Sequence, residues 1–278
     1  MNRYANSILI GLAITMLATA ACTSNTFNPE ATQTLIVEGY LYAGATVDSV
    51  KVSQLIPFVT DTNADYSISN AEVTLFWNDN VYPLTYQAGT QGHYGYEGTA
   101  LQIVEGQQYS LTLNHNGQTA TATTTVPTRP TGVSLSFYRL EVAPIDDFED
   151  LFNRGEQEPL EVLWDNPTAE PYYVLIENTE ESPEEINQLD FDGFGRPNFS
   201  FITEPTTLDV YNVLPFSLTQ YGRYRVVVFH VNQSYADLYE TAEQDSRNLT
   251  EPLSNINNGL GIFTSFSSDT VYLDIVKP

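Results

Sequence analysis

The sequence predicts an all-β protein built of two β-sandwich domains, with one short helix in the second. Three observations favour this class. Short runs of alternating apolar and polar residues, broken by Gly, Asn, Asp and Pro, recur along most of the 278-residue chain, as they do in antiparallel strands. The chain carries 18 Tyr, 14 Phe and 2 Trp, residue types that favour strands. Only one segment places its apolar residues at helical spacing.

The N-terminus has the pattern of an export signal followed by a lipid anchor. Residues 1–21 contain one arginine, the short apolar run 8–17 and four small residues directly before Cys22. A bilayer span needs about 20 apolar residues, so the pattern is that of a cleaved signal peptide. A Cys directly after small residues resembles the lipobox of bacterial lipoproteins, in which the thiol is acylated. We therefore expect Cys22 to anchor the mature chain and residues 22–34 to form a polar tether; a secreted protein with an incidental Cys is the less favoured alternative.

Residues 35–127 are expected to form the first sandwich. The alternation of apolar residues predicts strands at residues 35–42, 49–55, 72–77, 81–85, 93–97, 108–114 and 118–126. Residues 78–80 form a cluster of turn residues between two of these strands. Asn116-Gly117 lies between two others, and Asn-Gly is the strongest short signal for a hairpin. Strands at this spacing are typical of an immunoglobulin-like sandwich.

Two prolines and a glycine in residues 127–132 interrupt the pattern, so the second domain is expected to span residues 128–278. Its predicted strands are residues 133–142, 160–164, 172–177, 221–231 and 270–276. Trp164, the Asn166-Pro167 turn and the strand that begins with Tyr after it resemble the B-to-C region of a fibronectin type III sandwich. Residues 178–207 are rich in Glu, Pro, Asn and Gly, and we expect them to form a long loop insertion.

One helix is expected at residues 234–245. Its apolar residues Tyr235, Leu238, Tyr239 and Ala242 fall at positions i, i+3, i+4 and i+7. That spacing places them on one face of a helix.

The charge balance excludes nucleic-acid binding as a function. The chain has 10 Lys plus Arg against 35 Asp plus Glu, a formal net charge of -25. Binding to phosphates needs a surplus of basic residues instead. One Cys and three His also exclude a zinc site of the Cys/His kind.

No motif for catalysis is present in the sequence. The chain lacks Gly-x-Ser-x-Gly, His-Glu-x-x-His and a phosphate-binding glycine loop that opens a helix. A Ser/His/Asp triad stays open as an alternative, because its members need not be close in sequence. We expect a binding or assembly protein and not an enzyme.

Residues 61–72 are the best candidate for a metal site. Oxygen-bearing side chains at alternate positions of this run match the calcium loop of an EF-hand. The candidate ligands are Asp61, Asn63, Asp65, Ser67 and Glu72. A polar connection between two strands is the favoured alternative, because Tyr66 stands where that loop needs Gly and no helix is predicted beside it. Calcium is thus the one candidate cofactor.

Two further kinds of site are expected. Asp48-Ser49-Val50 and Asp269-Thr270-Val271 resemble the acceptor tripeptide for O-glycosylation in Bacteroidota, so Ser49 and Thr270 are candidate acceptors. Phe191 and Phe194 flank a glycine within the predicted loop insertion and are candidates for contact with a partner. Of the other aromatic residues considered as a stacking surface, most are expected in a core: Tyr94, Tyr96, Tyr138, Phe199 and Phe201.

Three segments together resemble a known family. They are residues 37–41, residues 71–75 with 82–84, and residues 251–263, which contain Asn-Ile and Gly-Leu-Gly-Ile-Phe. The family is an uncharacterised lipoprotein family of the Bacteroidota, known as domain of unknown function 4249. The resemblance implies an outer-membrane lipoprotein, often encoded beside a TonB-dependent receptor, and implies no catalytic residue.

The expected function is therefore that of an outer-membrane-anchored binding or accessory subunit, with a TonB-dependent receptor or a similar outer-membrane complex as its partner. An adhesin-like or structural surface protein is the alternative. Residues 23–26 lack the acidic residues that favour surface export in this phylum, so the face of the membrane stays open between periplasm and cell surface. Within residues 251–263, we expect Ile262 and Phe263 to fill the second core, with contact to the receptor as the alternative.

Overall fold

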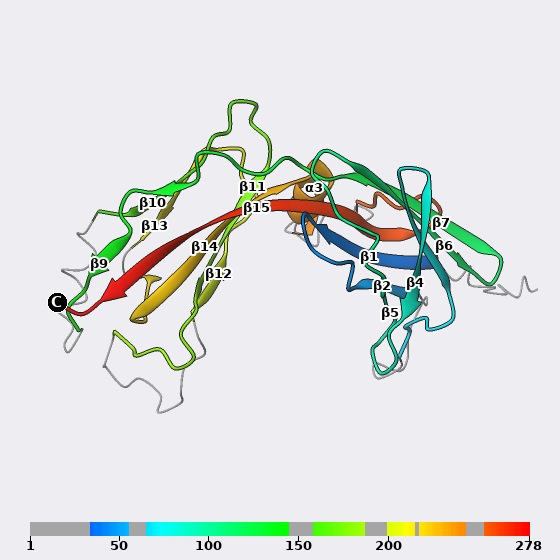
Figure 1. Ribbon diagram of the computed structural model, residues 1–278, viewed down its shortest axis with the longest axis horizontal. Coiled ribbons are helices and arrows are strands. Elements are labelled where there is room, and N and C mark those ends of the chain that lie inside the picture. Colours follow the sequence, from blue (N-terminus) through cyan, green and yellow to red (C-terminus); the bar gives the residue numbers. More distant parts are fainter. Residues whose placement is uncertain (1–33, 56–64, 145–157, 187–198, 215–216, 243–252) are drawn as a thin grey trace, which may run out of the picture. The chain divides into compact units, whose positions relative to one another are not determined.

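The computed structural model describes residues 34–55, 65–144, 158–186, 199–214, 217–242 and 253–278 (Figure 1). Within these ranges the protein consists of two β-sheets and one helix, so the predicted all-β sandwich class is confirmed. The large sheet has the strand order β12-β11-β14-β15-β1-β2-β5-β4-β3-β6-β7, with β9 paired to β15. The small sheet has the order β13-β10-β8.

Each strand predicted for residues 35–127 is present. They are β1 (Thr34–Tyr42), β2 (Val50–Leu55), β3 (Glu72–Trp77), β4 (Asn80–Tyr86), β5 (His93–Gly95), β6 (Gln108–His115) and β7 (Gln118–Thr125). Both predicted turns are also confirmed. Asn78 and Asp79 have φ angles of 49° and 61°, and Asn116 and Gly117 have 49° and 80°. Two successive positive φ angles match the twist of the strands that a hairpin joins.

The second half contains shorter strands and the helix. Its elements are β8 (Ser134–Leu135), β9 (Arg139–Glu141), β10 (Leu160–Leu163), β11 (Tyr172–Asn178), β12 (Ser200–Ile202), β13 (Val210–Val213), β14 (Gly222–Val231), α3 (Gln233–Ala242) and β15 (Leu260–Val276). The expected helix is confirmed, although its predicted last residues, 243–245, lie outside the described residues.

Three expectations for this half are corrected. The predicted strand 133–142 is two strands, because β8 pairs with β10 in the small sheet and β9 pairs with β15 in the large one. The predicted loop 178–207 contains a strand, β12, which pairs with β11. The last strand begins ten residues before the predicted start, residue 270, because Leu260–Asp269 is paired with β1 and β14 despite its Gly and Ser content. Pairing partners can thus override the weak strand preference of a segment.

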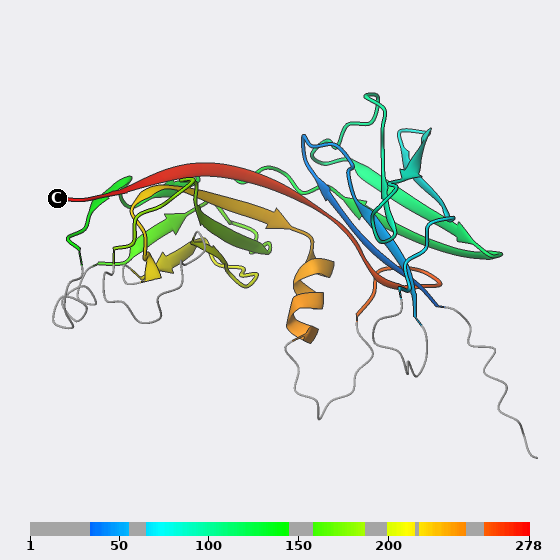
Figure 2. The ribbon, with the colours of Figure 1, turned by 90° about the horizontal axis from the view of Figure 1, so that it is seen from below.

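Strand β15 is shared by the two halves of the sheet. Its first part pairs in parallel with β1, from Leu260 to Phe266, and its second part pairs antiparallel with β14, from Phe266 to Ile275. Residues Thr34–Pro278 accordingly form one compact unit. In Figures 1 and 2 this strand is the long red arrow that runs beside both β1 and β14.

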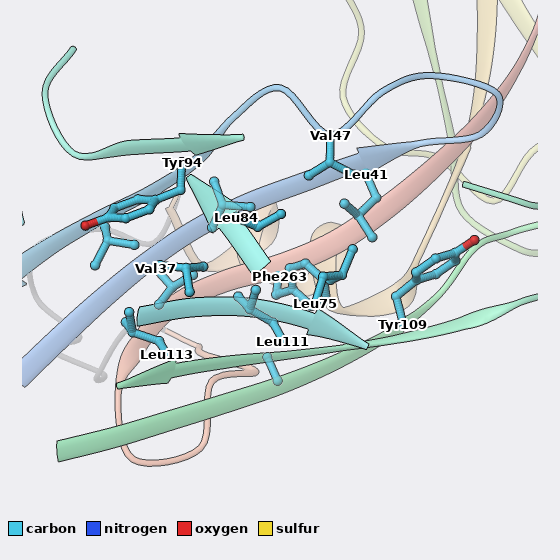
Figure 3. Close-up of a cluster of buried hydrophobic side chains, with 14 of the residues drawn as sticks. Val37, Leu41, Val47, Leu75, Leu84, Tyr94, Tyr109, Leu111, Leu113 and Phe263 are labelled. Carbon is cyan, nitrogen blue, oxygen red and sulfur yellow. The ribbon is translucent and has the colours of Figure 1, made fainter. Parts of the chain in front are cut away.

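The buried apolar side chains form two main cores. The first is built by β1 to β7, and the second lies between the small sheet and strands β11, β14 and β15. Phe263 is fully buried in the first core, beside Val37 and Leu75 (Figure 3). The expectation that Phe263 fills the second core is therefore wrong, because the β1 pairing carries this part of β15 into the first.

Glycines let β15 approach β1 closely. Gly261 has a φ of 104°, and a Cβ at this position would lie 2.1 Å from the carbonyl oxygen of Val37. On the partner strand, a Cβ at Gly39 would lie 2.8 Å from Cδ2 of Phe263. The Phe263 ring thus occupies the space beside a residue that has no side chain.

An asparagine side chain closes the loop before β15. The Asn255 amide nitrogen donates to the carbonyl oxygen of Phe263 at 2.7 Å, and the Phe263 amide donates to Oδ1 of Asn255 at 2.8 Å. Two residues later, Asn257 and Thr121 exchange backbone hydrogen bonds of 2.8 and 3.1 Å. The segment that contains Asn255 and Asn257 therefore links β7 to the start of β15 through hydrogen bonds.

We expect Phe263→Ala to lower the free energy of unfolding by about 3 to 5 kcal/mol, because it truncates a fully buried aromatic side chain. Gly39→Ala should also destabilise, by about 1 to 3 kcal/mol, because its methyl group overpacks against the Phe263 ring. In the double variant the second loss should largely disappear, since the ring is gone. Urea unfolding of the four proteins gives the coupling energy.

Tyr272→Ala is the matched control for Phe263→Ala. It also truncates an aromatic side chain of β15, but one that is 43% exposed, so its loss of stability should be smaller. Additive effects of Gly39→Ala and Phe263→Ala would contradict the packing described for these two positions.

Candidate binding surface

Six aromatic side chains gather on the face of the large sheet that is turned away from the two main cores, around a small third cluster of buried residues. Neighbouring residues in a strand point to opposite faces, and here Leu41, Tyr172 and Val228 belong to the cores. The adjacent aromatic residues therefore lie on the other side, where α3 also packs. We call this set the aromatic face: Tyr40 and Tyr42 on β1, Tyr173 on β11, Phe229 on β14, Tyr235 on α3 and Phe266 on β15.

Phe266 is the centre of the aromatic face. Its ring stacks on Tyr42 with the centroids 5.1 Å apart, and Tyr235 meets it edge to face at 5.0 Å. Tyr40 lies 6.1 Å from the same ring. Tyr173 and Phe229 stack on one another at 4.7 Å. Such aromatic pairs contribute about 0.5 to 1.5 kcal/mol each beyond their buried area, so the rings stabilise one another without a bound partner.

Strand register places these rings together. Tyr42 is the register partner of Phe266 in the β1–β15 pair, and Tyr173 is the partner of Phe229 in the β11–β14 pair. The helix is held by Asn232, whose carbonyl oxygen accepts from the amides of Tyr235 and Ala236. The Asn232 side-chain nitrogen lies within hydrogen-bond distance of Thr124 Oγ1, at 2.9 Å, and of Ser265 Oγ, at 3.0 Å. The start of α3 is therefore tied to β7 and β15.

Exposure changes across the aromatic face. Phe266 is 2% exposed and Tyr173 is 8% exposed, whereas Tyr40 and Tyr42 reach 36% and 42%. The face thus has a buried base and an exposed rim on β1. Glu38 and Lys51 stand beside this rim and form an ion pair, with 3.4 Å between Oε1 and Nζ.

Burial makes the phenols of this surface harder to ionise than an ordinary tyrosine. Desolvation raises the pKa of Tyr40, Tyr42, Tyr173 and Tyr235 above the ordinary value. Glu38 adds to the rise in the pKa of Tyr40. Among the described residues, no hydrogen-bond partner is found for the four hydroxyl groups. At neutral pH they are free to donate to a ligand or partner and are poorly suited to act as nucleophiles.

The calcium candidate is only partly covered by the structure. Asp61 and Asn63 lie outside the described residues. The Asp65 carboxylate accepts a hydrogen bond from the Ser67 amide at 2.9 Å, and hydrogen bonds from Ser67 lower the pKa of Asp65. Glu72 is exposed at the start of β3. In the described ranges, no group of three or more His, Cys, Asp or Glu is placed to hold a metal ion, and calcium binding at residues 61–72 stays a prediction.

Both candidate O-glycosylation sites are accessible. Ser49 is exposed just before β2, and its hydroxyl lies 2.6 Å from Nδ1 of His93. Among the described residues, no carboxylate accepts a hydrogen bond from this imidazole, so no triad forms around it there. Thr270 is exposed on β15, and its amide donates to the Asp269 carboxylate at 2.9 Å. Glycosylation of either residue stays a prediction.

The remaining predicted sites lie outside the described residues: Cys22, Phe191 and Phe194. In the part of the chain that is described, no helix has both the length and the apolar character to cross a bilayer. The aromatic face is not evident from the sequence, because its six members come from five elements. One signal was present in the chain, namely Tyr40 and Tyr42 at alternate positions of one strand. Of the aromatic residues expected in a core, Tyr94 is buried in the first core, but the expectation is wrong for Tyr138 and Phe201, which are exposed.

Comparisons with known proteins give a family and a set of distant structures. A family model described as "Domain of unknown function (DUF4249)" matches residues 24–271. The FN1–FN3 domains of chicken CNTN1 are 14% identical with a TM-score of 0.27, over 87% of this chain and 66% of that one. A fragment of titin is 12% identical with a TM-score of 0.23, over 86% of this chain and 62% of that one. The chain thus spans just under two-thirds of each structure. No curated protein matches the chain.

The raised pKa of Tyr173 predicts a loss of stability in alkali. As the pH rises through about 10, the unfolded chain releases this phenolic proton while the folded protein retains it, so the free energy of unfolding falls. The loss from one such group is at most about 1.4 kcal/mol per pH unit. We expect Tyr173→Phe to fall less steeply than the wild type between pH 10 and pH 12 and to differ little from it at pH 7. Urea unfolding across this range measures both; an unchanged slope would contradict the desolvation of Tyr173.

Proposed function

Because the chain belongs to the DUF4249 family, whose model matches residues 24–271, we propose that it is a lipid-anchored binding subunit of the bacterial outer membrane. In this proposal a TonB-dependent receptor, or a similar outer-membrane complex, is the partner. The aromatic face is the observation that carries the proposal. The protein captures or docks and performs no chemistry of its own.

The proposed anchor is supported by the sequence that precedes the first strand. Cys22 stands directly after four small residues and an apolar run too short to span a bilayer. Strand β1 begins at Thr34, so only a short polar segment separates the acylated residue from the first strand. A body held this close to the membrane meets an integral membrane partner at high effective concentration.

The aromatic face has the properties of an interface. Tyrosine is enriched at protein interfaces, because its ring buries a large area while its hydroxyl remains able to hydrogen-bond. The rings of Tyr40 and Tyr42 are held against Phe266 before binding, so little side-chain entropy is lost when a partner covers them. Their partial exposure, 36% and 42%, leaves apolar area to be buried on docking.

Substituting the anchor tests the first part of this proposal. Cys22→Ser should abolish acylation and leave the protein uncleaved or released from the membrane, because Cys22 is the only Cys in the chain. Metabolic labelling with palmitate and fractionation of membranes measure both effects. Label that persists in Cys22→Ser would show that the lipid is attached elsewhere and would contradict the anchor at Cys22.

Truncating the rim of the aromatic face tests the second part. We expect Tyr42→Ala to weaken capture of the outer-membrane partner by about tenfold or more, which corresponds to about 1.4 kcal/mol. Tyr272→Ala is the matched control, because Tyr272 is 43% exposed and lies on the same sheet but outside the aromatic face. The measurement is affinity capture from detergent-solubilised native membranes, with identification of the proteins retained.

Retention of a TonB-dependent receptor by wild type and Tyr272→Ala but not by Tyr42→Ala is the expected result. Equal retention by all three would remove the aromatic face from the interface. A body that captures no membrane protein but adheres to matrix or cells would favour the adhesin-like alternative instead.

A further inference from the structure

A groove runs along one side of the second core, where both sheets end. The large sheet ends at β12 and the small sheet ends at β13. Between these edges lies a groove of about 480 Å³, within the range of peptide- and ligand-binding sites. It is lined by residues Phe201 to Thr206, by Leu208, Val210 and Tyr211, and by Tyr239 of α3. In the described part of the chain, no strand pairs with the outer edge of β12.

The hydrogen-bonding pattern shows which backbone groups this edge presents. The Thr203 amide donates to the carbonyl oxygen of Val174, and the Asn178 amide donates to that of Phe199. Between these two bonds, Phe201 is paired with Ile176 and points its own backbone groups toward β11. The N–H and C=O groups of Ser200 and Ile202 therefore point away from β11. They are spaced as a further antiparallel or parallel strand requires.

The side chains beside these groups are apolar and exposed. Phe201 is 42% exposed, Ile202 is 57% exposed and Leu208 is 62% exposed. Soluble proteins usually protect an edge strand with charged residues, Pro or a bulge. An edge that carries exposed Phe and Ile beside a groove of mixed polar and apolar lining has the properties of a surface that accepts an additional strand.

The charge of the groove indicates the composition of that strand. Glu204 is the only charged residue in its lining. Its carboxylate also contributes, after burial, to the raised pKa of Tyr211, which shows that its negative charge is felt inside the groove. No lysine or arginine lines the groove to balance it, and the whole chain has a net charge of -25. A basic residue in the incoming strand would be favoured at this point.

We propose that the edge of β12 binds an extended segment of a partner protein, which adds to the large sheet as one further strand. Its alternate apolar side chains enter the groove over Phe201 and Leu208, and a Lys or Arg lies near Glu204. Main-chain hydrogen bonds to Ser200 and Ile202 supply the register. This site is separate from the aromatic face and does not depend on the proposed function, although α3 contributes Tyr235 to one and Tyr239 to the other.

The test uses the full-length protein and a fluorescein-labelled peptide of the sequence Lys-Val-Thr-Val-Thr-Val-Thr-Val-Lys. Binding is measured by fluorescence anisotropy. A second peptide has the same side chains but is N-methylated at every internal residue, so it cannot pair as a strand. A third replaces both Lys by Glu. We expect the first peptide to bind at least tenfold more tightly than either of the others.

Two variants at one position separate strand pairing from apolar contact. Ser200→Pro removes an outward N–H and places a ring where the new strand would lie, while the bonds to β11 remain. Ser200→Ala keeps that N–H. We expect Ser200→Ala to bind the first peptide like the wild type and Ser200→Pro to bind it at least tenfold more weakly, with thermal melting used to confirm that both variants are folded.

Three results would overturn the proposal: no binding of the first peptide, equal binding of its N-methylated form, or equal binding by Ser200→Pro and Ser200→Ala. Tyr42→Ala should bind the first peptide normally. Failure of this proposal is therefore distinguishable from failure of the aromatic face as an interface.

Discussion

The parallel pairing of β15 with β1 is the constraint on which the rest of the structure depends. It brings the C-terminal strand back to the first strand of the body, and the same strand then continues as the partner of β14. Phe263 and Phe266 are three residues apart and so lie on opposite faces of the strand. The pairing therefore inserts Phe263 into the first core and, by the same register, places Phe266 at the centre of the aromatic face. Gly39 and Gly261 make the close approach of the two strands possible.

Near Phe266, the main pairing partner of β15 changes from β1 to β14. The polar groups at this point form hydrogen bonds with one another. Thr124 and Ser265 hydroxyl groups lie 2.9 Å apart, and Asn232 reaches both. The carbonyl oxygen of Thr128 accepts from the Ser267 hydroxyl at 2.7 Å and lies 2.8 Å from Nδ1 of His230. Burying such groups without partners would cost about 1 to 3 kcal/mol each. The network thus specifies how β7, β15 and the start of α3 fit together, which is also what positions Tyr235.

The two proposed binding surfaces differ in their physics. The rings of the aromatic face are packed against a buried base, so the face suits a preformed partner surface. The groove beside β12 offers unpaired backbone groups and apolar side chains, so it suits a segment that becomes ordered on binding. Helix α3 contributes one tyrosine to each surface. Under the proposed function, the two surfaces together hold a folded partner and one of its extended segments at the same time.

The sequence by itself determined the features that depend on neighbouring residues. Period-two alternation located each strand from β1 to β7, Asn-Gly located a hairpin, and helical spacing located α3. The candidate anchor at Cys22 rests on adjacent residues, and the family resemblance rests on short segments that can each be read in the chain. Tertiary structure alone decided the features that depend on distant pairing. These are the length of β15, the division of residues 133–142 between two sheets, the core that Phe263 enters, the aromatic face and the open edge of β12. No local pattern encodes which strand will lie beside another, because that choice depends on the burial of residues that are far apart in the chain.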